Sequence, residues 1–106
     1  MANRLKGKII YFDQFNADAT LSTGSNPFMI KKIRLLSAGD GDIFQLEDND
    51  GNVLFDIVNT GANDTVECDF GPEGFNFGGN GVNIDVSDCT GLAATSGVDA
   101  VWIYLA

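Results

Sequence analysis

Histidine is absent from this chain of 106 residues, and lysine and arginine are absent from every position after Arg34. Histidine is the commonest general base and metal ligand near neutral pH, so its absence removes the simplest ways to build a catalytic site. Without histidine partners, Cys68 and Cys89 cannot complete a standard zinc site. The glycine-rich stretch 71–81 has no lysine and no following helix, both of which a phosphate-binding loop requires. We therefore predict a protein that is not an enzyme and that holds no metal or cofactor.

Long apolar runs are missing as well. The longest uninterrupted apolar stretches are only a few residues, which is too short to span a membrane. The segment 1–8 is positively charged but no apolar stretch of signal-peptide type follows it, so we expect synthesis in a cytoplasm. Structural disulfides are rare in a cytoplasm, so we expect both cysteines to be free thiols, with Cys68 on the apolar face of a strand. A disulfide between Cys68 and Cys89 is the alternative that the sequence leaves open.

The charge that the chain does carry is divided sharply along its length. The formal net charge is -9, yet all 6 basic residues lie within the first 34 positions, where only Asp13 and Asp18 oppose them. Complementary fields steer partners and fix their register, so this division suits a small subunit whose two surfaces meet different neighbours. The plainer alternative is that acidic residues keep a β-protein soluble and its edges unpaired. An acidic chain repels phosphates, so we expect no nucleic-acid partner.

Apolar residues alternate with period two, and no segment shows sustained helical periodicity. The alternation predicts strands at 8–12, 28–36, 42–47, 53–57, 65–70, 82–86 and 98–105. Polar and glycine-rich stretches predict a loop at 16–27 and a loop or irregular edge at 71–81. We predict an all-β fold, an antiparallel β-sandwich or jelly roll of about seven to eight short strands. Residues 1–106 would form one domain with a short basic segment at 1–7.

The hairpin signal is strongest at Asp50-Gly51, which separates two alternating runs. A calcium loop would need oxygen ligands where Leu46 and Ile57 stand, so we interpret the acidic run as a turn. A weak surface calcium site stays open as an alternative, assembled from Asp40, Asp42, Asp48 and Asp50.

Three local patterns predict where individual side chains point. The pair Lys31-Lys32 interrupts the alternation of the longest strand, which indicates a bulge or an edge position. In the return strand 53–57, alternation predicts that Val53, Phe55 and Ile57 are buried. Two aromatic residues in the glycine-rich stretch, at positions 75 and 77, could stack on sugars, but we favour a role in pinning this stretch to the core.

Two groups of residues are candidate contacts for partners. The first is the basic set, which comprises Arg4, Lys6, Lys8, Lys31, Lys32 and Arg34. The second lies on the terminal strand, which is apolar on both faces and is therefore expected to be covered on both. One face can enter the core, whereas the face with Trp102 and Tyr104 must meet a covering loop, such as 71–81, or another subunit. Tryptophan and tyrosine are enriched in the cores of interfaces.

The central hairpin and the terminal strand resemble small all-β proteins encoded among the virion genes of tailed bacteriophages. The residues that carry the resemblance are 33–42, Gln45-Leu46-Glu47-Asp48, Asp50-Gly51-Asn52-Val53-Leu54-Phe55 and the final Val101-Trp102-Ile103-Tyr104-Leu105-Ala106. These elements cover about half of the chain, and the glycine-rich stretch 71–81 departs from the more compact pattern of that family.

The resemblance implies a structural role in the virion, most simply as a capsid decoration (cement) protein that binds the shell of major capsid protein or other virion subunits. It also implies a homo-oligomer, with a trimer favoured because capsid decoration often occupies threefold positions. The alternative is a tail, neck or fibre-associated module that binds a glycan or receptor, which exposed aromatic residues around a concave acidic patch would favour.

Overall fold

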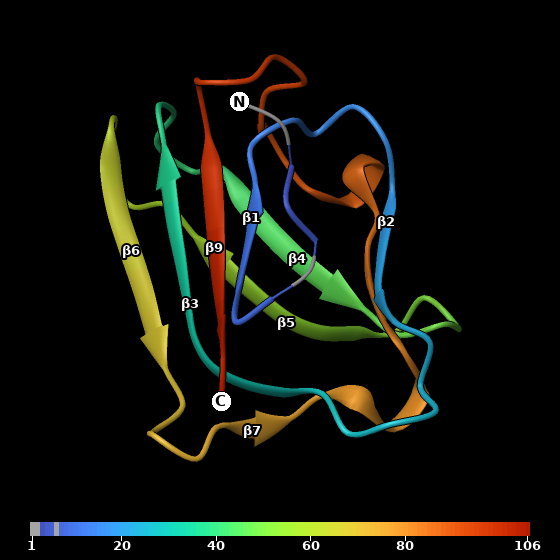
Figure 1. Ribbon diagram of the computed structural model, residues 1–106. Helices are drawn as coiled ribbons and strands as arrows, with labels where there is room; N and C mark the ends of the chain where they lie inside the picture. Colours follow the sequence, from blue (N-terminus) through green and yellow to red (C-terminus); the bar gives the residue numbers. More distant parts are fainter. Residues whose placement is uncertain (1–2, 6) are drawn as a thin grey trace.

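The alternating segments form two antiparallel sheets that pack face to face, as Figure 1 shows. The computed structural model describes residues 3–5 and 7–106. Sheet A has the strand order β1-β9-β3-β6 with β7 attached to β3, and sheet B has the order β2-β8-β4-β5. The predicted all-β antiparallel sandwich is confirmed, and within the described part of the chain no helix is long and apolar enough to cross a membrane.

The elements have the following bounds. Sheet A contains β1 (Ile9–Phe12), β3 (Met29–Ser37), β6 (Asp64–Asp69), β7 (Phe75–Asn76) and β9 (Ala100–Leu105). Sheet B contains β2 (Ala19–Ser22), β4 (Ile43–Glu47), β5 (Val53–Val58) and β8 (Val82–Ile84). Two single-turn 3₁₀ helices flank β8, namely η1 (Gly78–Asn80) and η2 (Val86–Asp88).

The core lies between the sheets and takes inward residues from both. Its fully or almost fully buried members are Ile10, Phe12, Ile30, Ile33, Leu35, Phe44, Leu46, Val82, Ile84, Val101 and Ile103. Phe15 closes one side, with its ring edge-on to Phe12 at a centroid distance of 4.9 Å. The terminal strand β9 therefore buries one face in the core, as its sequence predicts.

The strand β2 lies inside the segment that the sequence analysis assigned to a loop, so that assignment was wrong for Ala19–Ser22. Its residues pair antiparallel with β8, and the register shifts between Thr20 and Ser22. The partner strand is about sixty residues away in the sequence, and the short polar stretch around β2 has the composition of a turn. Its strand character depends on this distant pairing.

The strand β5 corrects a second expectation, because Val53 is 55% exposed. The register of the β4–β5 pair shifts between Leu46, which faces Phe55, and Glu47, which faces Val53. Leu54 is therefore an extra residue, or bulge, in β5. A bulge turns the residues before it to the other face of the sheet, so Val53 points to solvent. Phe55 and Ile57 do pack against the core, as predicted.

The hairpin between β4 and β5 is confirmed as a turn. The Asp48 carboxylate accepts backbone N–H groups from Asp50 and Asn52, each at 2.9 Å, and Gly51 has a φ of 81°. This φ lies in the left-handed region that glycine adopts without steric cost. Both cysteines are free, with Cys89 buried and Cys68 half-buried.

Candidate functional site

The outer face of sheet A brings the aromatic pair Trp102 and Tyr104 together with two residues of the basic set, Lys32 and Arg34. In the register of the sheet, Trp102 lies between Tyr11 of β1 and Arg34 of β3. One pair further along, Tyr104 lies between Ile9 and Lys32. Side chains of directly opposed residues project from the same face of a sheet, so the aromatic and basic residues are immediate neighbours.

The cations of β3 lie over the rings of β9. The Arg34 guanidinium carbon is 4.9 Å from the centroid of the Trp102 ring, and Lys32 Nζ is 5.1 Å from that of Tyr104. Tyr11 adds a tilted ring contact to Trp102 at 5.4 Å. Each cation–π pair at a partly exposed site contributes about 0.5–1 kcal/mol. The chain thus half-covers Trp102 and Tyr104 with its own side chains, and we call this surface the aromatic-basic face.

The predicted bulge at Lys31-Lys32 is confirmed by a shift of the β3–β9 register between Ile30 and Lys32. Because β3 lies between β9 and β6, the alternative of an edge position is wrong. Lys32 also lies 3.5 Å from a carboxylate oxygen of Glu67 on β6, the one ion pair within 4.0 Å among the described residues. An open hollow of about 390 Å³ borders Tyr104 and is lined by Lys31, Lys32, Asp69, Gly71, Pro72 and Tyr104.

The remaining basic residues border the same sheet. Arg4 exchanges two backbone hydrogen bonds with Tyr11, at 2.7 and 2.8 Å, and its Nε donates to the Ile9 carbonyl at 3.2 Å. Lys8 Nζ donates to the Ala106 carbonyl oxygen at 2.9 Å. The predicted contact Lys6 lies outside the described residues. The strands of sheet B contain no lysine or arginine, whereas the strands of sheet A contain both the cations of β3 and the carboxylates Asp64, Glu67 and Asp69 of β6.

The predicted pinning role is confirmed for Phe77 and wrong for Phe75. Phe77 is buried and packs edge-on against Phe70 and Phe55, with ring centroids 5.2 and 6.5 Å apart. Phe75 makes an edge-on ring contact with Phe77 at a centroid distance of 5.0 Å and remains 59% exposed. The stretch 71–81 is thus anchored at the open end of the sandwich, where β7 pairs with the start of β3, and its first residues border Tyr104.

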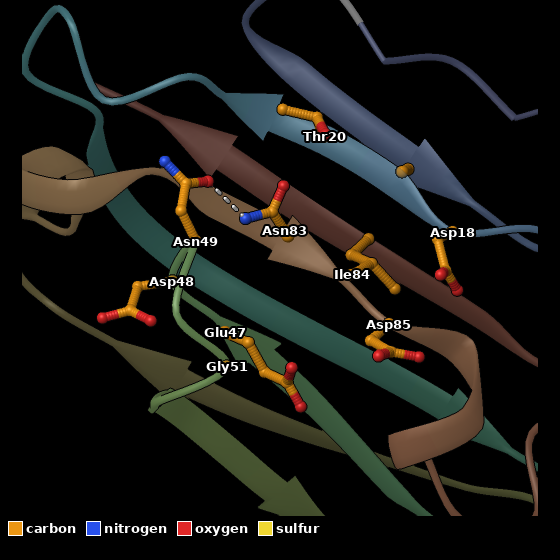
Figure 2. A pocket seen from close by; sticks show the side chains of 10 residues that line it. Asp18, Thr20, Glu47, Asp48, Asn49, Gly51, Asn83, Ile84 and Asp85 are labelled. Carbon is orange, nitrogen blue, oxygen red and sulfur yellow. Dashed lines mark hydrogen bonds between the residues drawn. The ribbon is translucent and has the colours of Figure 1, made fainter.

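Sheet B carries an open acidic hollow of about 400 Å³ on its outer side. Figure 2 shows Asp18 and Asp85 at one end and the hydrogen-bonded pair Asn49 and Asn83 at the other. Glu47 and Asp48 contribute further carboxylates, and none of the lining residues is aromatic or basic. This hollow therefore lacks the aromatic ring that a sugar-stacking site would require.

A compact carboxylate cluster adjoins this hollow. Oxygen atoms of Glu47, Asp85 and Asp88 all lie within 4.8 Å of one another. Glu47 is only 6% exposed and accepts a hydrogen bond from Gln45 Nε2 at 2.7 Å. Hydrogen bonding to Asp88 and burial raise the pKa of the Glu47 carboxyl above its ordinary value. Burial likewise raises the pKa of the neighbouring Cys89 thiol to about 11.

Sequence reasoning missed this cluster because Glu47 and Asp85 are far apart in the chain and meet only through the pairing of β4 with β8. The short spacing from Asp85 to Asp88 is the one local signal. The acidic residues that the sequence offered for calcium do not form such a group in the described structure. Instead Asp42 accepts hydrogen bonds from Ser37 and Gly39, and Asp48 closes the hairpin.

No family model, no curated protein and no solved structure matches this chain. What the chain does must therefore be inferred from its own surfaces.

Proposed function

We propose that this chain is a non-enzymatic structural protein of a bacteriophage particle, a capsid decoration (cement) protein that binds the shell of major capsid protein. The resemblance of its hairpin and terminal strand to phage virion proteins supports this function. The observation that carries the proposal is the aromatic-basic face. There Trp102 and Tyr104 lie beside Arg34 and Lys32, while the strands of the opposite layer contain no lysine or arginine.

The aromatic-basic face has the composition of a binding surface. Tryptophan, tyrosine and arginine dominate the binding energy of protein interfaces, whereas an exposed ion pair contributes only about 0–1 kcal/mol. Burial of the rings therefore supplies the larger part of the affinity, at about 25 cal/mol per Å² of apolar surface. The cations select an acidic patch on the shell and fix the orientation, and sheet B faces solvent.

Trp102 and Tyr104 share one face with Arg34 and Lys32, so a single partner can cover all four side chains. We assign that partner to the shell, because the cations over Trp102 and Tyr104 fit an acidic surface. The register also places Glu67 opposite Arg34 and Asp69 opposite Lys32, so carboxylates of β6 border the cations on this face. Because the shell covers this face, the proposed homo-oligomer, a trimer by resemblance to the phage proteins, requires a different contact between copies.

A tail, neck or fibre-associated module that binds a glycan or receptor is the second candidate. One observation favours it: the hollow beside Tyr104 combines an aromatic ring with Lys31, Lys32 and Asp69. Aromatic faces stack on sugar rings, and charged groups hold hydroxyl or carboxylate substituents. The acidic hollow of sheet B does not add support, because its lining contains no aromatic residue.

The test replaces Lys31, Lys32 and Arg34 by glutamine and measures binding to phage particles that lack this chain. We expect binding to weaken about tenfold at low salt, as the loss of three modest ion pairs requires, and to become less sensitive to salt. Asp56→Asn on sheet B is the matched control and should bind normally. Unchanged occupancy at both low and high salt would eliminate this attachment, and binding to surface glycans in place of the shell would favour the second candidate.

A further inference from the structure

Phe75 is the most exposed of the large apolar side chains that the structure describes, and its ring is held in place. Its strand β7 pairs with Met29 and Ile30 of β3, and its ring contacts the buried Phe77 edge-on. A fixed aromatic ring in water is a favourable anchor for association, because little conformational entropy is lost when it is covered. The acidic residues Asp69 and Glu73, both exposed, precede it around the turn at Gly71–Gly74.

A second hollow lies at the β1 border of sheet A and has the complementary character. Its volume is about 330 Å³, and Arg4, Gly7, Lys8 and Ile9 line it. Ile9 and the adjacent Leu5 are 36% and 39% exposed, so the site offers apolar surface. Both cations are held by carbonyl oxygens, and neither has a carboxylate side chain within 4.0 Å among the described residues.

Phe75 cannot reach the hollow of its own copy. The pairing across sheet A runs from β1 through β9 and β3 to β7. The Leu105 N–H donates to the Lys8 carbonyl, Leu105 pairs with Ile30, and Ile30 pairs with Phe75. The β1 border and β7 are therefore separated by β9 and β3, a distance of about 14 Å at the usual strand spacing. Within residues 3–5 and 7–106 the ring of Phe75 and the side chain of Ile9 are both exposed, so a second molecule has access to each.

We infer that copies of this chain associate by seating Phe75 of one copy in the hollow at Arg4, Gly7, Lys8 and Ile9 of the next. The apolar ring covers Ile9, and Asp69 and Glu73 approach Arg4 and Lys8. Donor and acceptor surfaces differ, so the contact can repeat around a closed ring such as a trimer. This inference deepens the homo-oligomer within the proposed function. The contact uses Ile9 and Asp69, which lie beside Tyr104 and Lys32 in the register of sheet A, and leaves Trp102 and Arg34 to the shell.

The test is the sedimentation of the isolated protein without phage particles. We expect the wild-type chain to sediment as an oligomer, and both Phe75→Asp and Ile9→Asp to raise its dissociation constant at least about tenfold, since either buries a charge at the contact. An equimolar mixture of the two variants should form a heterodimer but no closed ring, because each variant contributes one intact surface to a single contact. Trp102→Ala is the control and should sediment as the wild type does. Far-ultraviolet spectra and thermal melts establish that each variant is folded.

A wild-type monomer at about 0.1 mM would overturn the inference. So would continued assembly of the folded Phe75→Asp variant, or a mixture that fails to associate. Dissociation caused by Trp102→Ala would place the contact between copies on the aromatic-basic face and also overturn it. Shell binding is measured separately with the Lys31, Lys32 and Arg34 variant, so a failure of one proposal is distinguished from a failure of the other.

Discussion

The register of sheet B places the Glu47 carboxyl among other carboxyl groups. The bulge in β5 pairs it with Val53, while β8 pairs it with Asn83, and its carboxyl lies on the outer side of sheet B. The titratable groups that act on it are Asp88 and Asp85, and the Glu47 charge in turn contributes to the raised pKa of the buried Cys89 thiol. No lysine or arginine occurs on the strands of this sheet, so protonation of Glu47 reduces the repulsion between the carboxylates.

We expect Glu47→Gln to stabilise the fold at neutral pH and to flatten its pH dependence. The folded-state pKa of Glu47 is raised above its ordinary value of 4.5, so its contribution to stability is present below pH 4.5 and is lost as pH rises through the folded pKa. Glutamine keeps an acceptor for Gln45 and gains a donor for Asp88. The free energy of unfolding at pH 7 should rise by about 0.5 kcal/mol in urea titrations. An unaltered slope between pH 4 and 7 in Glu47→Gln would contradict the assignment.

At the scale of elements, the strands that could be predicted are those whose alternation is complete within their own sequence. Two adjacent charges in the middle of a run marked the bulge at Lys31-Lys32, because a regular strand cannot turn both outward. The bulge at Leu54 could not be predicted, since Val53, Leu54 and Phe55 are all apolar and only the pairing with β4 decides which faces water. The short strand β2 was missed because its own sequence is polar like a turn, and its pairing with the distant β8 alone makes it a strand.

The turn of the central hairpin gives an element-scale prediction. Gly51 has a φ of 81° with nothing within 4 Å of an added Cβ, so Gly51→Ala tests backbone conformation without a steric clash. A left-handed conformation costs a non-glycine residue about 1–2 kcal/mol, and we expect the free energy of unfolding to fall by about 1 kcal/mol.

Gly79→Ala is the matched control, because its Cβ would also meet open space and its φ is not in the left-handed region. It should cost at most a few tenths of a kcal/mol in the same chemical denaturation experiment. Equal losses in the two variants would mean that the Gly51 turn is not held in its left-handed conformation.

At the scale of the whole molecule, the division of charge was visible in the sequence, but its placement was not. The basic residues and the aromatic pair of the terminal strand were predicted as separate contact groups. They coincide because β3 pairs with β9, which places Arg34 opposite Trp102 and Lys32 opposite Tyr104. Pairing between segments this distant follows from the tertiary fold and has no local signal. The hollow at the β1 border likewise depends on the antiparallel pairing of Arg4 with Tyr11.

The carboxylate cluster and the aromatic-basic face predict that salt acts in opposite directions on stability and on attachment. The carboxylates of Glu47, Asp85 and Asp88 lie within 4.8 Å of one another, and the described residues form one ion pair within 4.0 Å, so screening removes more repulsion than attraction from the isolated fold. The screening length falls from about 30 Å at 0.01 M to about 8 Å at 0.15 M salt. Over that range we expect the free energy of unfolding to rise by about 1 kcal/mol, or about 4–8 °C in midpoint, while shell binding weakens.

The melts should use the Phe75→Asp variant, so that self-association does not contribute to the midpoint. The double variant Asp85→Asn, Asp88→Asn should begin with a higher midpoint at low salt and gain less from added salt, because part of the repulsion in the Glu47 cluster is already gone. A midpoint that stays constant or falls as salt is added would show that the carboxylates of sheet B do not repel one another strongly enough to affect folding.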